Sequence, residues 1–113
     1  MTLRELNQLR YLRREIQMDA ERLVRLEHQN TASDRQQITE LRKIISDKRV
    51  RCIRERNRLE NHIASVEDSL VRQIMTLRFV DGLSWQGVAM RIGGGNTENN
   101  VKKIIHRYLR SHR

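Results

Sequence analysis

The sequence predicts an all-α fold in two parts: a long, coiled-coil-like antiparallel helical hairpin over residues 1–64 and a helix-turn-helix unit over residues 65–113. Three observations support this prediction. The 113 residues include no proline, which would interrupt a helix. Apolar residues recur at spacings of three and four, as on one face of a helix. Aromatic residues make up only 4% of the chain and charged residues 33%, which favours long amphipathic helices over a large core.

The first predicted helix begins at a capping box, in which Thr2 precedes Glu5 by three residues. Its apolar stripe follows heptad spacing and is interrupted at Asp19. The stripe consists of Leu9, Leu12, Ile16, Leu23 and Leu26. We expect this helix to end near His28, before a polar turn over residues 29–33.

A second capping box, from Ser33 to Gln36, predicts the start of the second long helix. Its stripe is thin around Lys48 and Arg56 and consists of Ile38, Leu41, Ile45, Cys52, Leu59, Ile63 and Val66. Two helices of similar length joined by a short turn predict an antiparallel hairpin. Because so narrow a pair buries its stripes poorly, we expect the hairpin to join two copies of the chain in a homodimer.

A third helix is predicted over residues 65–80, either continuous with the second or restarting at Asp68. Leu70, Ile74 and Leu77 are expected to face inward, and Gly82 to end the helix.

Two shorter helices are predicted after residue 82. Ser84 is placed to cap a helix over residues 85–91, with Trp85 as a core anchor and Val88, Ala89 and Ile92 on the buried face. Glycines at 93–95 predict a turn, and Thr97 the cap of the last helix, residues 97–110.

The last helix has one apolar and one cationic face. Its apolar face consists of Val101, Ile104, Ile105, Tyr108 and Leu109. Such a helix suits the major groove of DNA, where Asn pairs with adenine and Lys or Arg with guanine. The candidates for base contacts are therefore Asn99, Asn100, Lys102 and Lys103, and those for phosphate contacts are His106, Arg107 and Arg110. Ser84 and Gln86, at the start of the preceding helix, are further candidates for holding a phosphate.

The charge predicts a polyanionic partner, and the helix-turn-helix layout makes double-stranded DNA the expected one. The net charge is +9, and residues 99–113 hold five Lys/Arg and no acid.

One cysteine excludes an intrachain disulfide, and its place on the second stripe predicts a buried thiol. The four histidines lack ligand spacing, and no acidic residues converge. We therefore predict no metal, no cofactor and no enzymatic activity. No apolar run approaches the roughly 20 residues of a membrane span, and the start is not a signal peptide.

Three stretches carry a family resemblance: MTLRELNQLRYLRREI, RCIRERNRLENHIASVEDSLVRQIMTLRFVDGLSWQ and IGGGNTENNVKKI. Together they resemble the small phage late-gene transcription activators of the RinA/ArpU kind, and residues 77–109 resemble region 4 of the sigma-70-type factors. The resemblance implies a bacterial host cytoplasm, association with the nucleoid, and contact with host RNA polymerase. It also implies base contacts at Glu98, Asn99, Lys102 and Lys103, with Thr97 as the capping residue.

Three departures from the sigma pattern predict a different target sequence. The turn before Thr97 is two residues longer, Gly87 replaces an acidic residue, and Glu98 and Asn99 replace an Arg-Glu pair.

Two other functions remain alternatives. A small terminase-like packaging adaptor also joins a helix-turn-helix to oligomerising helices, although it often places those helices after the DNA module. A helical partner-binding module with incidental basic charge is the second.

Residues 48–58 hold six basic residues and one acid. They form either a second phosphate-contacting face or, as we favour, a solvated face with local pairs such as Asp47–Arg51 and Glu55–Arg58.

Overall fold

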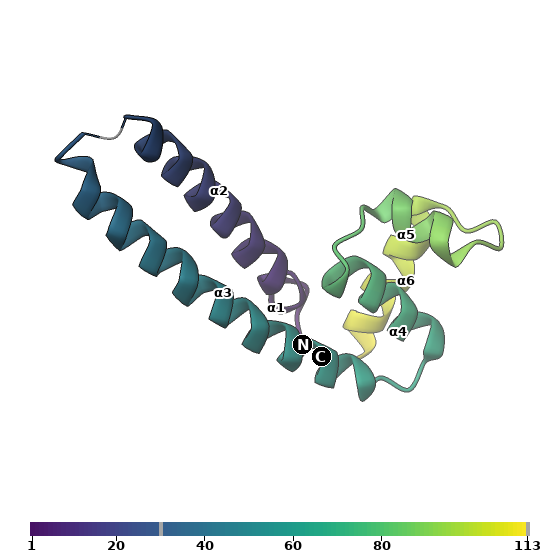
Figure 1. Ribbon diagram of the computed structural model, residues 1–113. Helices are drawn as coiled ribbons and strands as arrows, with labels where there is room; N and C mark the ends of the chain where they lie inside the picture. Colours follow the sequence, from purple (N-terminus) through teal and green to yellow (C-terminus); the bar gives the residue numbers. More distant parts are fainter. Residues whose placement is uncertain (30, 113) are drawn as a thin grey trace.

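The computed structural model describes residues 1–29 and 31–112, and within them every regular element is a helix. The all-α prediction is thus confirmed. None of the described helices is both long and apolar enough to cross a membrane. In chain order the elements are α1 (Leu3–Leu6), α2 (Gln8–Gln29), α3 (Asp34–Ala64), α4 (Ser69–Met75), the π-helix η1 (Thr76–Val80), α5 (Trp85–Ile92) and α6 (Glu98–Ser111), as labelled in Figure 1.

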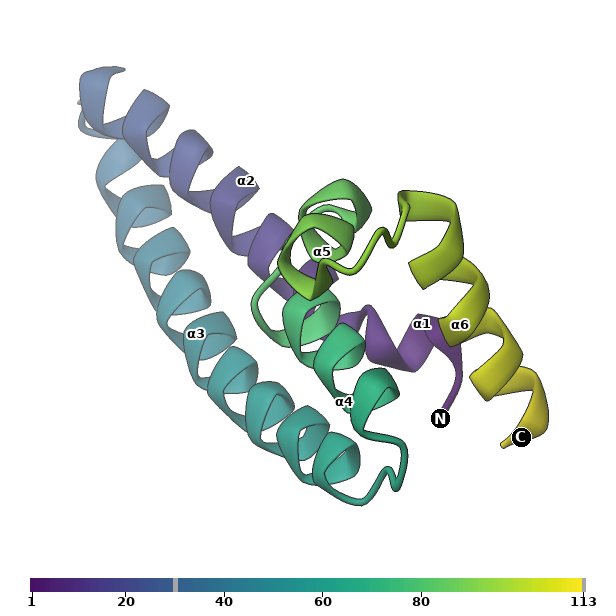
Figure 2. The same cartoon turned by 90° about the vertical axis from the view of Figure 1, so that its right-hand side faces the viewer.

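The two long helices α2 and α3 lie side by side in opposite directions and project from a smaller body formed by the remaining elements (Figures 1 and 2). The predicted stripe of α3 is confirmed at Ile38, Leu41 and Ile45, which are buried between the two helices. On α2, Leu9 is buried at the base of the pair, whereas Leu12, Ile16, Leu23 and Leu26 are only half-buried. The seam between the helices is therefore narrow, as expected for a pair with few neighbours.

The polar interruptions of the two stripes meet across the pair. Lys48 donates a hydrogen bond of 2.6 Å to Asp19 and lies 3.1 Å from Glu15. These contacts with the two carboxylates raise the pKa of Lys48 above its ordinary value. Both side chains of the Lys48–Asp19 pair are about four-fifths buried, so the pair links α3 to α2 within the hairpin.

One of the two predicted capping boxes forms only in part, and the other is wrong. The Thr2 hydroxyl accepts from the Glu5 amide at 3.2 Å, as predicted, and donates to the Glu5 carboxylate. Ser33 makes no capping bond, because its backbone is already helical (φ −70°, ψ −25°), whereas a capping side chain needs an extended residue. Instead, the Asp34 carboxylate accepts from the Thr31 hydroxyl and amide, at 2.6 and 3.2 Å.

The body and the base of the hairpin share one hydrophobic core. Leu6, Leu9, Leu59 and Ile63 belong to the same buried cluster as residues of α4, η1, α5 and α6. The latter include Val71, Ile74, Met75, Phe79, Val80, Val88, Ala89, Val101 and Ile105. The core therefore extends over both sides of residue 64, where we placed the boundary between the two predicted parts.

The third predicted helix starts later than its periodicity suggested. Asp68 caps it by accepting from the Val71 amide at 3.1 Å, so the restart at Asp68 is confirmed. The prediction for Leu70 is wrong: it is 38% exposed, because a helix starting at Ser69 turns Val71, Ile74 and Met75 inward. The wider η1 turn then buries Phe79 and Val80, and Gly82 takes the positive φ (+76°) expected after a helix end.

Candidate nucleic-acid interface

Helix α5 is positioned by its cap and by two small buried residues. The Ser84 hydroxyl accepts from the Gly87 amide at 3.1 Å, which confirms the predicted cap. Val88 and Ala89 are buried in the core, as predicted. Ser84 and Gln86 stay exposed at the N-terminal end of the helix. This end therefore presents polar side chains where first-turn amides favour an anion.

The glycine turn between α5 and α6 requires its glycines. Gly93, Gly94 and Gly95 all have positive φ, at +71°, +65° and +78°. Side-chain-bearing residues resist this region, so three in succession explain the glycine run. Asn96 closes the turn by donating from Nδ2 to the Gly93 carbonyl at 2.8 Å. The turn thus holds a fixed geometry and sets where α6 begins.

Helix α6 presents two faces, as predicted. Thr97 caps it by accepting from the Asn100 amide at 3.2 Å. Val101 and Ile105 are fully buried, and Ile104, Tyr108 and Leu109 pack partly buried against the core. The opposite side is exposed at Asn99, Asn100, Lys103, His106, Arg107 and Arg110. The apolar side thus fixes the helix while the polar side remains free to meet a partner.

Three cations of this exposed face form no ion pair within the described part of the chain. Among the described residues, no ion pair includes Lys103, Arg107 or Arg110. Lys102 differs, because it lies half-buried on the flank and pairs with Glu98 at 3.0 Å. Two of the predicted base contacts, Glu98 and Lys102, therefore form an ion pair with each other.

Helix α1 lies beside the C-terminal half of α6, which the sequence did not predict (Figure 2). A groove of about 990 Å³ separates them. Its α1 side includes Leu3 and Glu5, and its α6 side carries the cations Lys103, His106, Arg107 and Arg110. The two walls are about 100 residues apart in the chain, so no local pattern could reveal the groove.

Three arginines, Arg10, Arg13 and Arg78, lie around the segment that leads into α5, and the sequence did not indicate this role for them. Arg13 donates from Nη1 to the Val80 carbonyl at 2.7 Å. Arg78 donates from Nη1 to the Leu83 carbonyl at 2.9 Å and stacks over Trp85, with its guanidinium carbon 4.7 Å from the ring centroid. Burial, and secondly the charge of Arg10, lowers the pKa of Arg78.

Trp85 packs against the core, as predicted. Its ring meets Phe79 edge-on, with centroids 6.1 Å apart and planes at 89°. Arg78 also stacks over this ring. Trp85 therefore joins the core to the arginine cluster.

The basic residues at 48–58 are partly neutralised within the hairpin. Lys48 turns toward α2, Arg58 pairs with Glu55, and Arg56 pairs with Glu60 at 3.0 Å. The predicted Asp47–Arg51 pair is not among the ion pairs of the described residues. Cys52 is half-buried on the predicted stripe, and burial raises the pKa of its thiol.

Comparison with known protein families, with curated proteins and with solved structures finds no match for this chain.

Proposed function

We propose that the protein is a sequence-specific, double-stranded DNA-binding transcription regulator of a phage or prophage, an activator of late genes that reads the major groove with α6. The exposed face of α6 carries this proposal. That face combines amides at its N-terminal end with the cations Lys103, Arg107 and Arg110, which form no ion pair with the described residues. An apolar face buried in the core holds it in a fixed orientation.

The positions along α6 support a division of roles. Asn99, Asn100 and Lys103 are exposed in its first half, from which such a helix reaches base edges. Arg107 and Arg110 are exposed in its second half and suit phosphates at the groove margin. The Glu98–Lys102 pair would have to open, or act as a unit, to contribute to base recognition.

The proposal includes a homodimer formed through the hairpin and a contact with host RNA polymerase. Apolar side chains remain exposed along α2 and α3, at Tyr11, Met18, Val24, Ile44, Val50 and Ile53. Such surface favours association with a second copy. A symmetric pair would place two α6 helices about 34 Å apart, or a multiple of this, to match successive major grooves.

Selection from a random duplex pool, followed by footprinting, tests sequence-specific binding. We expect one enriched motif. Lys103→Ala should relax preference at one position by about five- to 150-fold, which corresponds to the loss of one bidentate base contact. Arg110→Ala should weaken all duplexes and lower the salt slope by about one. Arg25→Ala, an exposed arginine of α2 remote from α6, is the control. Equal effects of Lys103→Ala and Arg110→Ala on every sequence contradict the assignment.

The mass in solution separates this proposal from its alternatives. A dimer with a promoter footprint and polymerase-dependent activation in a purified transcription reaction supports the regulator. A ring of many subunits without any effect on transcription supports the packaging adaptor. No DNA binding even at low salt supports a module that binds only protein.

A further inference from the structure

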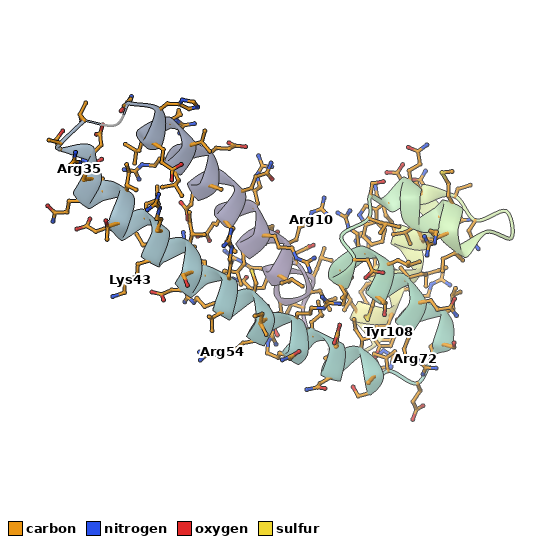
Figure 3. All side chains as sticks on the ribbon, viewed as in Figure 1. Arg10, Arg35, Lys43, Arg54, Arg72 and Tyr108 are labelled. Carbon is orange, nitrogen blue, oxygen red and sulfur yellow. The ribbon has the colours of Figure 1, made fainter. Side chains whose placement is uncertain are left out.

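Arginines from two distant segments gather at the N-terminal end of α5. Arg10 and Arg13 belong to the first turns of α2, and Arg78 belongs to η1. Arg13 lies 3.8 Å from where a Cβ on Gly82 would be, and Arg78 covers Trp85, the first residue of α5. Arg13 and Arg78 therefore border the segment from Val80 to Ser84, which leads into α5, and Arg10 lies near enough for its charge to act on Arg78. Figure 3 shows Arg10 between the start of α2 and this segment.

The cluster has no ion-pair partner among the described residues, although Asp81 lies in the segment that it borders. The charge of Arg10 is close enough to disfavour the charged form of Arg78. Like charges brought together in this way repel one another, and an anion placed beside them relieves the repulsion.

The three arginines differ in whether their side-chain N–H donors already bind the protein. Arg13 and Arg78 each donate to a backbone carbonyl, so they hold the segment before α5 in place. Arg10 is exposed and makes no hydrogen bond to the described residues. Its guanidinium thus has every donor free for an external anion, whereas Arg13 and Arg78 each use Nη1 on a backbone carbonyl.

We infer that Arg10 contacts a backbone phosphate of the duplex that α6 reads, so that the start of α2 forms a second DNA-contacting surface beside α5. This inference rests on the proposed function. The occupant is DNA because the cluster lies at the N-terminal end of α5, the helix that packs against α6. The contact is to phosphate because phosphates flank the groove in which a recognition helix lies. It would set the orientation of the protein on the duplex without specifying sequence.

Salt-dependent binding of a labelled, mixed-sequence duplex of about 30 base pairs tests the inference. Each phosphate contact contributes about 0.9 to the slope of log affinity against log salt. Arg10→Ala should therefore lower the slope by about 0.9 and weaken binding about eightfold near 0.1 M salt. Arg25→Ala removes the same charge from the same helix, about 22 Å away at 1.5 Å per residue, and should leave the slope unchanged.

Two further variants keep the test decisive if alanine disturbs the fold. Arg10→Lys retains the charge and should keep the slope, whereas Arg10→Gln has a similar length and should lose it. The helical circular dichroism of each variant verifies folding. If the wild-type protein binds the duplex and Arg10→Gln shows the same salt slope as Arg10→Lys, the inference is overturned and the proposed function stands. Failure of the wild-type protein to bind any duplex overturns the proposed function itself.

Discussion

Replacing Leu6 with alanine tests whether the two ends of the chain stabilise one another. Leu6 is fully buried, and it belongs to the same cluster as Val101 and Ile105 of α6. Truncating a fully buried leucine costs about 2.7–5 kcal/mol. Because α1 is a single turn at the surface of the core and can relax around the cavity, we expect a value near the lower end, about 3 kcal/mol.

This loss predicts a measurable change in melting temperature. Unfolding entropy is about 2.1 cal/mol/K per residue, so a chain of 113 residues changes its free energy by about 0.24 kcal/mol per degree near the midpoint. A loss of about 3 kcal/mol should therefore lower the Tm by about 13 °C. Leu3→Ala is the matched control in α1. Leu3 is 37% exposed, and its loss should cost less than about 1 kcal/mol.

Two spectroscopic signals report on different parts of the molecule. Trp85 is the sole tryptophan, so its fluorescence follows α5 and the contact with Phe79. Far-ultraviolet circular dichroism is dominated by α2 and α3, with 22 and 31 residues. We expect the two transitions to coincide and to shift together in Leu6→Ala. A Trp85 midpoint that stays at the wild-type value while the circular dichroism shifts would refute a shared core.

Three further predictions concern single contacts. Lys48→Met leaves Asp19 buried without its partner and should cost about 1–3 kcal/mol at neutral pH. Because the pKa of Lys48 is raised on folding, the wild-type contribution is complete below about pH 10.5 and is lost as the pH rises through the folded-state pKa. Urea unfolding should show this alkaline loss in the wild type only, and an equal loss in Lys48→Met contradicts the reasoning. Thr97→Ala should lower the free energy of unfolding in urea by about 1 kcal/mol, because it removes the capping hydroxyl. Thr97→Ser keeps that hydroxyl and should retain the stability; an equal loss in Thr97→Ser would show that the hydroxyl is not the cap. Gly94→Ala should cost about 1–2 kcal/mol because φ is +65°, and unchanged stability would show that the turn tolerates another conformation.

The features that the sequence predicted well depend on local chemistry. Ser84 and Thr97 precede helices that need a capping oxygen within three residues, and both form the expected bond. The glycine run has few alternatives to positive φ in a tight turn. The two faces of α6 follow directly from a period of 3.6 residues, because its buried and charged positions do not overlap.

The wrong or missing predictions concern positions whose structure depends on backbone conformation or on contacts between residues far apart in the chain. Ser33 matched a capping pattern, but its own backbone is helical and cannot place the hydroxyl at the amides. Leu70 fell on a plausible stripe with Ile74, yet the residues that are buried beside Ile74 are Val71 and Met75. The groove between α1 and α6 and the contact of Arg13 with Val80 join residues far apart in the chain. Periodicity carries no information about such contacts.

The shared core constrains how a dimer could present two copies of α6. Leu59 and Ile63, near the end of α3, pack in the same cluster as the buried residues of α6, so α6 is held against the base of the hairpin by a shared core. If the hairpin joins two copies, the distance between their α6 helices follows from rigid packing. The two half-sites should then tolerate only a fixed spacing, and inserting a few base pairs between them should abolish binding rather than weaken it gradually. Tolerance of several spacings would instead place the flexibility within the hairpin interface.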